Sequence, residues 1–402
     1  MKTGHTPSRS QPEYWDNVTI PWFTLADVWQ LRDGQRVYLG DTANQISELG
    51  LVNSAAELLP AGTVVLSRTA SVGFSGVMPT AMATSQDFWN WICGPDLMPE
   101  YLNYQFKAIA PALRALNMGS THQTIYQRDA AGIEIVVPPL AEQHAITDCL
   151  DRETARVDAL IDEQQRLIGM LRERRQAQID HAAWSGLDSA PRTENPVDPA
   201  PDVPAHWRVL RNKNLLREST TVSADGTEEL LSVSHLTGIT PRSEKNVTMT
   251  EAETLDGYRL VEPGDLVINT MWAWMGALGV SRFGGIVSPA YGVYRPLQGA
   301  EFHPQYFDYL YRSRPYVVEM TRFSRGIWSS RLRIYPEVFL RLHVVVPPID
   351  EQRRIASHLD EQTSKIDALI AETERFIELA RERRSALITA VVTGQIDARE
   401  VG

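Results

Sequence analysis

Apolar residues recur at alternating steps of three and four along two long stretches of the chain. The positions on this grid, a few of them polar, are Leu150, Thr154, Val157, Ile161, Gln164, Ile168 and Leu171, then Leu359, Thr363, Ile366, Ile370, Thr373, Ile377 and Ala380. A period near 3.5 residues is typical of a coiled-coil seam. The pattern therefore predicts two long helices. The first runs from residue 141 to 184, which at ~1.5 Å per residue is a rod of roughly 65 Å.

The two helical stretches are copies of one another. Val136-Val137-Pro138-Pro139-Leu140-Ala141-Glu142-Gln143 returns as Val345-Val346-Pro347-Pro348-Ile349-Asp350-Glu351-Gln352. The register then holds without a gap, since Asp158-Ala159-Leu160-Ile161 matches Asp367-Ala368-Leu369-Ile370 and Arg172-Glu173-Arg174-Arg175 matches Arg381-Glu382-Arg383-Arg384. A unit duplicated within one chain predicts an internal pseudo-two-fold repeat.

Local signals mark both ends of each helix. The Pro-Pro pair stops the preceding strand, and an acidic residue, Glu142 or Glu351, occupies the first turn, where the helix dipole favours negative charge. Gly186 and Gly394 stand where the helices are expected to end. Because each apolar stripe is narrow, we expect the copies to pair in antiparallel sense, with one block at each end of the rod. The alternative is that each helix packs on its own neighbouring block.

The chain thus divides into block, helix, linker, block and helix. The expected boundaries are 1–137 for the first block, 138–186 for the first long helix, 187–204 for the linker, 205–346 for the second block and 347–402 for the second long helix. The linker holds five prolines and four acidic residues, which predicts an extended, solvated segment.

The two blocks are also related to each other, more distantly than the helices. Residues 99–107 line up with 304–312, and both runs predict a helix with proline in its first turn. Residues 59–66 resemble 261–268, a turn followed by a buried strand. The predicted fold class is therefore α+β: two related globular α/β domains separated by a pair of long antiparallel coiled-coil helices. Similar scaffolds with different loops are expected of two domains that recognise different things.

Bulk composition fits a globular protein. A length of 402 residues favours two or three domains, and no apolar run reaches the roughly 18–20 residues needed to cross a bilayer. The N-terminal run lacks the apolar core of a signal peptide. Cys93 and Cys149 are far apart and lack CxxC spacing, which favours buried thiols in a reducing compartment over a zinc site. We expect a cytoplasmic protein with no membrane partner.

The net charge of −11 argues against nucleic acid, but the distribution of charge changes that argument. Most of the excess acid lies in the two helices and the linker. Within the second block, residues 312–333 hold six arginines and one acidic residue, Glu319. A local patch of this kind can neutralise phosphates whatever the global charge.

No catalytic pattern is evident. The phosphate-binding loop of nucleotide hydrolases, the dinucleotide-binding glycine motif, the HExxH zinc motif and the Asn-Pro-Pro-aromatic loop of methyl transfer are absent from the sequence. Nuclease chemistry needs clustered carboxylates with a lysine, and neither Asp96 nor Asp202 is followed closely by an acid-x-Lys pair. We expect a chain that is not an enzyme and that holds no metal or cofactor of its own.

Both blocks instead carry residues suited to recognition. Small hydroxyls, amides, arginines and aromatic residues beside glycine can contact base edges and phosphates. The candidate DNA-binding residues of the first block are Thr6, Ser8, Arg9, Tyr14, Trp15, Arg68, Ser71, Ser120, Thr121, His122, Gln123 and Tyr126. Those of the second block are Asn269, Thr270, Trp272, Trp274, Arg322, Arg325, Trp328, Ser329, Ser330, Arg331 and Arg333. For any single residue, a turn or core role is an equal alternative.

These features together resemble the specificity subunit of a type I restriction–modification system. The residues that carry the resemblance are Gly4-His5-Thr6-Pro7-Ser8, Tyr14-Trp15, Ile20-Pro21-Trp22, Gly119-Ser120-Thr121 and the two Pro-Pro-x-x-Glu-Gln helix starts. The resemblance implies that each block is a target-recognition domain for one half of a split, asymmetric site in double-stranded DNA. It also implies that the helices set the gap between the halves and dock two modification subunits, which methylate adenine with S-adenosylmethionine. Restriction and translocase subunits, which use ATP and Mg²⁺, would join that core.

One departure from the family pattern concerns the start of the first block. The family's blocks usually open with a Trp-containing strand, and the second block has one in Pro204-Ala205-His206-Trp207-Arg208-Val209-Leu210. The first block lacks it, so we expect that block either to be incomplete or to begin further upstream.

Three other functions stay open at this point. The chain could be a protein-interaction adaptor with dimerising helices, an autonomous enzyme with an unrecognised site, or the specificity subunit of a related phage-defence methylase. The absence of clustered carboxylates and of a nucleotide loop weighs against the autonomous enzyme.

Overall fold

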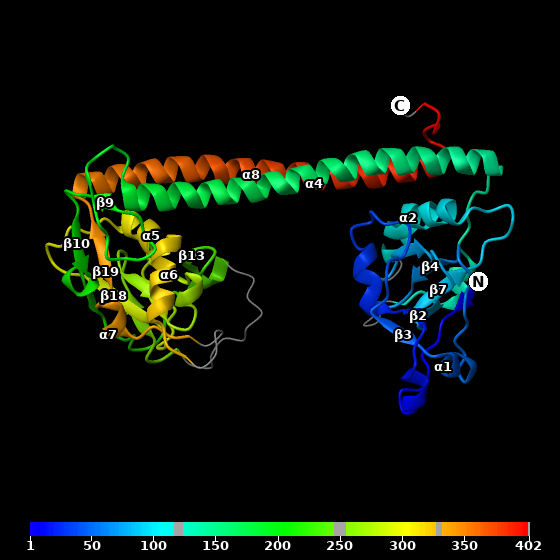
Figure 1. The fold of residues 1–402 in the computed structure, drawn as a ribbon, viewed down its shortest axis with the longest axis horizontal. Coiled ribbons are helices and arrows are strands. Elements are labelled where there is room, and N and C mark those ends of the chain that lie inside the picture. Colours follow the sequence, from blue (N-terminus) through cyan, green and yellow to red (C-terminus); the bar gives the residue numbers. More distant parts are fainter. Residues whose placement is uncertain (116–123, 245–254, 327–331, 401–402) are drawn as a thin grey trace. The chain divides into compact units, whose positions relative to one another are not determined.

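The chain folds into two compact units. A computed structural model describes residues 1–115, 124–244, 255–326 and 332–400 (Figure 1). Unit 1 comprises Met1–Arg166 together with Thr373–Gly402, and unit 2 comprises Leu167–Glu372. The long helices α4 (Leu140–Ser185) and α8 (Ile349–Val392) each contribute one part to either unit.

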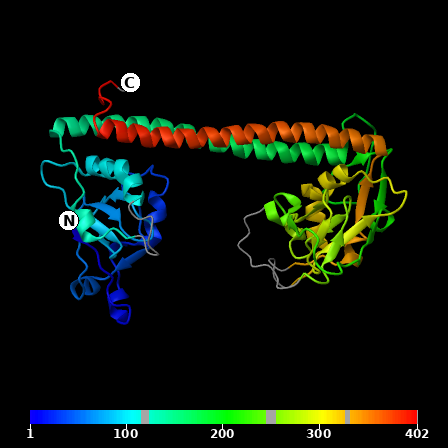
Figure 2. The same ribbon diagram turned by 180° about the vertical axis from the view of Figure 1, so that it is seen from behind.

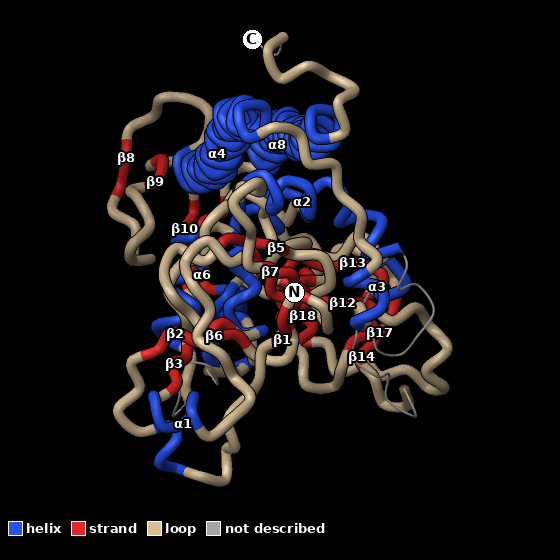
Figure 3. Tube along the Cα trace, turned by 90° about the vertical axis from the view of Figure 1, so that its right-hand side faces the viewer, coloured by secondary structure: helices blue, strands red, loops and turns tan. Residues whose placement is uncertain are grey.

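Within each unit, its parts of the two long helices lie side by side (Figure 3), joined by an ion pair between Asp158 and Arg384 in unit 1 and between Arg175 and Asp367 in unit 2. Of the nine residues predicted to pair them, six are buried: Leu150, Ile161, Ile168, Leu359, Ile366 and Ile377. The other three are half-buried: Val157, Leu171 and Ile370. The helices also pack on the domain beside them. Leu150 and Ile388, for example, share an apolar cluster with Tyr101 and Tyr104 of unit 1. The long helices therefore pack both on each other and on the neighbouring domain, which were the two alternatives predicted from the sequence.

Glycine ends both helices as predicted. Gly186 and Gly394 have φ angles of 71° and 73°, in the left-handed region that a residue with a Cβ rarely adopts. The first helix agrees with its predicted extent within a residue or two. The second is shorter than the predicted 347–402, because the glycine turn stops it at Val392 and residues 393–400 are not helical.

Unit 1 is built on a four-stranded antiparallel sheet of order β1-β7-β4-β5 and a three-stranded sheet of order β3-β2-β6. Its strands are β1 (Lys2–Thr3), β2 (Ile20–Phe23), β3 (Asn44–Ile46), β4 (Val64–Ser67), β5 (Ser75–Val77), β6 (Ala83–Thr84) and β7 (Phe88–Trp91). Its shorter helices are α1 (Glu48–Val52), α2 (Pro99–Ala115) and α3 (Gln127–Ala131). Helix α2 lies between the four-stranded sheet and the long helices, because Leu102 and Phe106 pack on the sheet while Tyr101 and Tyr104 pack on α4 and α8 (Figure 2).

Unit 2 repeats this plan. Its four-stranded sheet has the order β11-β18-β15-β16, which matches the main sheet of unit 1 strand for strand. Its strands are β8 (Arg192–Thr193), β9 (Val203–Pro204), β10 (Arg208–Arg211), β11 (Leu216–Glu218), β12 (Leu231–Ser234), β13 (Gly238–Pro241), β14 (Arg259–Val261), β15 (Leu266–Ile268), β16 (Leu278–Val280), β17 (Gly285–Val287), β18 (Gly292–Pro296) and β19 (His343–Val346). Its helices are α5 (Pro304–Arg312), α6 (Arg314–Phe323) and α7 (Pro336–Phe339). The predicted α+β fold with an internal repeat is confirmed.

The turn and buried strand predicted in both blocks are present. Strands β4 and β15 are fully buried, and the turns before them contain Gly62 and Gly264 with φ angles of 80° and 95°. The predicted helix of the first block extends to 17 residues as α2. In unit 2 the equivalent stretch is divided at Ser313 into α5 and α6.

Two expectations about the connections are wrong. Residues 187–204 are not a solvated linker, because β8 pairs with β9 and the side chains of Val197 and Val203 are fully buried in the core of unit 2. Arg322 also holds this segment by an ion pair with Asp198. In addition, no strand precedes the first Pro-Pro pair, although β19 precedes the second.

A buried glutamine fixes each long helix to its domain. The side chain of Gln143 donates to the carbonyl oxygens of Asp96 and Pro138, both at 2.8 Å, and accepts from the amide of Met98 at 2.9 Å. Gln352 makes the same three bonds, to Glu301, Pro347 and His303. Both glutamines are completely buried. The last residue of the repeated Pro-Pro-x-x-Glu-Gln motif therefore sets the direction in which each helix leaves its domain.

In the described part of the chain, no helix combines the length and apolarity that a membrane span requires.

Candidate nucleic-acid interface

In unit 1, four short segments converge beyond the end of β4. The amide of Arg68 donates to the carbonyl of Asp87 at 2.9 Å, and the carbonyl of Arg68 accepts from Ile125 at 2.8 Å. The Asp87 carboxylate accepts from the hydroxyls of Thr69 at 2.6 Å and Ser85 at 2.8 Å. The hydroxyl of Thr6 donates a hydrogen bond to the side-chain oxygen of Gln86, the residue before Asp87. The candidates near Thr6 and Arg68, distant in sequence, are thus brought to one edge of the domain.

The side chain of Arg68 is fixed in place by an aromatic ring. Its guanidinium lies 4.5 Å from the ring centroid of Trp89, within the range of a cation–π interaction. The indole of Trp89 in turn donates to the carbonyl of Ile125 at 3.0 Å. Ala70, two residues on, has a φ of 54°, so the loop that carries Ser71 turns sharply. Beside it, Tyr126 exposes 67% of its surface. This edge presents arginine, hydroxyl and aromatic groups together.

The two aromatic candidates near the N-terminus, Tyr14 and Trp15, have mainly structural roles. Trp15 packs edge-on against Trp22, with ring centroids 5.4 Å apart, and its indole donates to the carbonyl of Ser8 at 3.1 Å. The backbone of Tyr14 accepts from the Ser47 hydroxyl at 2.8 Å. Ser8 and the adjacent Arg9 are exposed. The two aromatic candidates therefore support the loop, and the exposed residues of that loop are the better candidates for contact.

The corresponding edge of unit 2 has different chemistry. Buried Asn269 donates to the hydroxyl of Tyr291 at 3.1 Å, and Thr270 donates to the carbonyl of Ala290 at 2.8 Å. Trp272 and Trp274 stack with an interplanar angle of 21°, and Trp272 remains 48% exposed. Asn269 is thus a structural residue, while Trp272 offers an aromatic surface.

The arginines predicted in unit 2 fall into two groups. Arg325 and Arg333 are exposed and joined by two backbone hydrogen bonds of 2.8 and 2.9 Å, so their backbones lie side by side. Arg322 lies elsewhere, ion-paired with Asp198 and Glu319. Its charge is already balanced by these carboxylates, which weakens its candidacy for a phosphate contact.

Eight candidates lie outside the described residues: Ser120, Thr121, His122, Gln123, Trp328, Ser329, Ser330 and Arg331. The described residues that follow them are equivalent in the two units. The amide of Ile125 donates to the carbonyl of Arg68, just beyond β4. The amide of Ile334 donates in the same way to the carbonyl of Thr270, just beyond β15.

Sequence reasoning missed three residues of these edges. Tyr335 holds the place in unit 2 that Tyr126 holds in unit 1, and it is 46% exposed. The signal was available, because the spacing of the helix repeat carries Tyr126 onto Tyr335. Gln86 and Asp87 were also missed, and no sequence pattern shows that they meet Thr6 and Thr69.

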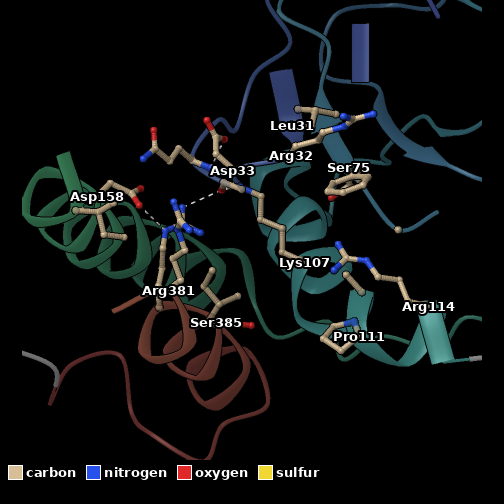
Figure 4. Close-up of a pocket in the computed structure, with 18 of the residues that line it drawn as sticks. Leu31, Arg32, Asp33, Ser75, Lys107, Pro111, Arg114, Asp158, Arg381 and Ser385 are labelled. Carbon is tan, nitrogen blue, oxygen red and sulfur yellow. Dashed lines mark hydrogen bonds and ion pairs between the residues drawn. The ribbon is translucent and has the colours of Figure 1, made fainter. Parts of the chain in front are cut away.

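A second cluster of charge lies where the domain of unit 1 meets its part of the helices (Figure 4). The guanidinium of Arg384, only 8% exposed, forms an ion pair of 2.9 Å with Asp158 and donates to the carbonyl of Gly34 at 2.8 Å. Lys107 donates to the carbonyls of Gly34 and Arg36, both at 2.9 Å. These contacts border a cavity of about 430 Å³.

Burial sets the ionisation of this cluster. It lowers the pKa of Lys107 to about 8, and the positive charge of Arg384 acts in the same direction. Burial also raises the pKa of Asp158, against the opposing effect of Arg384. The cluster is thus a costly arrangement of partly dehydrated charges, held by specific partners.

Unit 2 contains the equivalent junction. Arg175 and Asp367 form an ion pair of 2.8 Å, and they occupy the repeat positions of Arg384 and Asp158. Arg312, the counterpart of Lys107, donates to the carbonyl of Leu236 at 3.0 Å. A cavity of about 510 Å³ adjoins Arg175 and Arg312. The repeat in sequence is therefore also a repeat of the junction between domain and helix.

The described residues contain no group of three or more His, Cys, Asp or Glu side chains arranged to hold a metal ion. What the two edges offer is hydrogen bonding, aromatic surface and positive charge, which is binding chemistry.

Comparison with known proteins agrees with this architecture. Residues 1–167 match the family model described as the type I restriction modification DNA specificity domain. The MjaIX specificity subunit of Methanocaldococcus jannaschii is 30% identical over 149 residues, which are 37% of this chain and 34% of that protein. The EcoR124I/EcoR124II specificity subunit of Escherichia coli is 24% identical over 185 residues, 44% and 43% of the two chains. The chain thus spans less than half the length of these curated relatives.

Solved structures share the fold over nearly the whole chain. One, described as "Structural basis underlying complex assembly and conformational transition of the type I R-M system", is similar with a TM-score of 0.65 and 16% identity, over 98% of this chain and 96% of that one. The HsdS subunit from Thermoanaerobacter tengcongensis gives a TM-score of 0.50 and 16% identity, over 98% and 95%. The fold defines a protein with two related globular units and paired long helices. The chain carries a match to the type I restriction modification DNA specificity domain over residues 1–167, and it is similar to type I restriction–modification specificity subunits.

Proposed function

We propose that this chain is the DNA-recognition subunit of a type I restriction–modification complex and catalyses no reaction itself. The observation that carries the proposal is the repeat of one interface. The unit that matches the specificity domain and the unit that follows it have the same sheet order and the same loop junction beyond β4 or β15. Two related binding edges on one chain suit a duplex with two half-sites.

Each unit would bind one half of an asymmetric site. The support is that equivalent positions carry different chemistry. Arg68 of unit 1 is replaced by Thr270 in unit 2, and the exposed Trp272 stands close to the position of Ser71. Because base edges differ in their donors, acceptors and methyl groups, different side chains at one position select different bases.

The long helices would set the gap between half-sites and dock the partner subunits. Their outer faces carry exposed apolar residues at equivalent positions. Leu160 and Leu369 are 37% and 49% exposed, and Met170 and Leu379 are 63% and 57% exposed. Two equivalent apolar patches fit two copies of one partner, the modification subunit. S-adenosylmethionine, ATP and Mg²⁺ would act on the modification and restriction subunits, inside a cytoplasmic complex.

Adenine-methylation mapping tests this function. The chain is co-expressed with its modification subunit in a host that lacks adenine methylases, and genomic methylation is mapped. Methylation at one split, asymmetric motif with a fixed gap is the expected result. A soluble complex that forms normally but methylates no motif would favour a protein-interaction adaptor instead.

Single substitutions then assign the half-sites. Arg333→Ala is expected to relax recognition of one half-site, and Arg68→Ala that of the other, each by about 1–3 kcal/mol. The measurement is the methylation rate on duplexes with one altered base pair. If each variant weakened both halves equally, the assignment of one unit to one half-site would be wrong.

A further inference from the structure

The cavity of unit 1 at the junction of domain and helices is bordered by more positive than negative charge. Its basic lining residues are Arg32, Lys107, Arg114, Arg381 and Arg384, and its acidic ones are Asp33, Asp158 and Asp162. Figure 4 shows that they come from several elements, with Asp158 on α4, Arg381 on α8, and Lys107 and Arg114 on α2. This local excess of positive charge contrasts with the net charge of −11 of the whole chain.

Three of the arginines that border this cavity have no carboxylate partner. Arg384 and Asp158 form an ion pair of 2.9 Å, so their charges offset each other. Arg32, Arg114 and Arg381, in contrast, form no ion pair within the part of the chain that the structure describes. Their charges are therefore available to a ligand.

Two basic side chains are held in place without being neutralised. The guanidinium of Arg114 lies 4.8 Å from the ring centroid of Phe74, within the range of a cation–π interaction. Lys107 donates to the carbonyls of Gly34 and Arg36, both at 2.9 Å. An ammonium has three N–H groups, so these two bonds leave one donor for a ligand.

The equivalent cavity of unit 2 lacks this available charge. Three of the arginines that border it each form an ion pair with a carboxylate. The pairs are Arg175 with Asp367 at 2.8 Å, Arg312 with Asp308 at 3.4 Å and Arg314 with Glu173 at 2.9 Å. The repeat has thus kept basic residues at both junctions, but only in unit 1 are several of them left without a carboxylate.

The rest of the lining suits the body of an organic molecule. Leu31, Phe74, Ile161 and Ile388 contribute apolar side chains. The volume of about 430 Å³ lies within the range of roughly 300–1,000 Å³ that is usual for small-molecule sites. Several guanidiniums together with an ammonium match a phosphate monoester, which carries nearly two negative charges and three acceptor oxygens.

We propose that this cavity of unit 1 binds a small organic phosphate of about mononucleotide size. The phosphate lies among Arg114, Arg381 and Lys107, and the organic body covers the apolar wall. Because these residues belong to both the domain and the long helices, the ligand joins the two within unit 1. The site is separate from the proposed DNA interface, since none of the candidate DNA-binding residues lines the cavity.

Calorimetric titration of the full-length chain with AMP tests the site. AMP is expected to bind at one site per chain, about tenfold more tightly than inorganic phosphate, because its body covers the apolar wall. Adenosine, which lacks the phosphate, should show no binding. Arg114→Gln and Arg381→Gln should each weaken AMP binding about tenfold, because a charge-assisted hydrogen bond is lost. Arg383→Gln is the matched control, since Arg383 is exposed on the same helix and does not line the cavity.

Three results would overturn the proposal. The first is the absence of saturable binding of both AMP and inorganic phosphate. The second is a loss of AMP affinity that is the same in Arg383→Gln as in Arg381→Gln. The third is displacement of AMP by a random DNA duplex, which would mean that the cavity takes the phosphates of the DNA backbone rather than a small molecule.

Proton uptake provides a second measurement. Burial, together with Arg384, lowers the pKa of Lys107 to about 8, while Asp158, Asp151 and Asp33 act in the opposite direction. A bound phosphate dianion favours the charged ammonium and so raises this pKa. At about pH 8.5, binding of AMP should therefore take up protons, which titrations in two buffers of different ionisation enthalpy measure.

Lys107→Arg is the matched variant for proton uptake. Arginine occupies the repeat position, Arg312, in unit 2, and it stays charged at every pH used. The variant should keep its affinity for AMP within about threefold and lose the proton uptake. Uptake that is equal in the variant and the unchanged chain would show that Lys107 does not face the phosphate, and it would overturn the proposed placement of the ligand.

Discussion

At the scale of single residues, the buried glutamines show how a short motif determines geometry. Gln143 uses both amide hydrogens and its oxygen on three backbone groups that belong to the domain and to the helix start. Gln143→Leu keeps similar volume but leaves those groups without partners. Each such buried group costs about 1–3 kcal/mol.

We therefore expect Gln143→Leu to lower the unfolding free energy of unit 1 by about 3 kcal/mol. Urea unfolding, with hydrogen exchange to locate the loss, measures it. Gln165→Leu is the matched control, because that side chain is exposed on the same helix. A loss of less than about 1 kcal/mol would mean that water or local rearrangement replaces the three bonds.

Lys107 provides a residue-scale prediction about pH. Its pKa in the folded protein is about 8, below the ordinary 10.5, so between these values the unfolded chain binds more protons than the folded one. Stability therefore rises with pH across this window. Lys107→Met should abolish the rise while lowering stability overall, since two hydrogen bonds are lost. Urea titrations of both proteins at roughly pH 7.5, 8.5 and 9.5, on both sides of the folded pKa of about 8, measure how the stability of each protein changes with pH. Parallel pH profiles of the two proteins would contradict the assignment of the rise to Lys107.

At the scale of elements, the repeat offers one ion pair in two environments. Arg384 and Asp158 are 8% and 16% exposed, whereas their counterparts Arg175 and Asp367 are 35% and 52% exposed. Removing one partner of a buried pair leaves an uncompensated charge and costs about 3–5 kcal/mol, but exposed pairs contribute about 0–1 kcal/mol.

Arg384→Ala is thus expected to destabilise its unit by about 3 kcal/mol, and Arg175→Ala by less than about 1 kcal/mol. The same chemical change at equivalent positions makes each variant the control for the other. Thermal unfolding measures the destabilisation caused by each substitution at about 0.05 and 0.5 M salt, where the Debye length is roughly 14 and 4 Å. The effect of Arg384→Ala should depend less on salt than that of Arg175→Ala. Equal losses would show that burial is not what distinguishes the two junctions.

Sequence patterns predicted the elements better than their contacts. The 3.5-residue period identified both long helices, and the Gly186 and Gly394 signals identified their ends, because these depend on local chemistry. The linker was mispredicted since proline and acid content says nothing about tertiary burial, and Val197 and Val203 are buried there. The meeting of Thr6, Arg68 and Asp87 could not be predicted, because it depends on how separate loops cross one sheet edge.

At the scale of the whole molecule, the repeat constrains how the proposed gap could be changed. The helices pair in antiparallel sense within each unit, with Asp158 opposite Arg384 and Arg175 opposite Asp367. Lengthening only one helix would disrupt this register in one of the units. Inserting one heptad after Ile161 and another after Ile370, which are equivalent positions of the repeat, lengthens both helices and keeps the 3.5-residue seam.

If the helices set the spacing, this double insertion should lengthen the methylated gap by about three base pairs, because seven residues add ~10.5 Å and duplex DNA rises ~3.4 Å per base pair. The half-site bases should stay the same, since both recognition edges are unaltered. Methylation mapping measures both. The insertion after Ile370 alone is the control, and it should lower stability without defining a new gap. An unchanged gap in the stable double variant would show that the spacing is determined elsewhere in the complex.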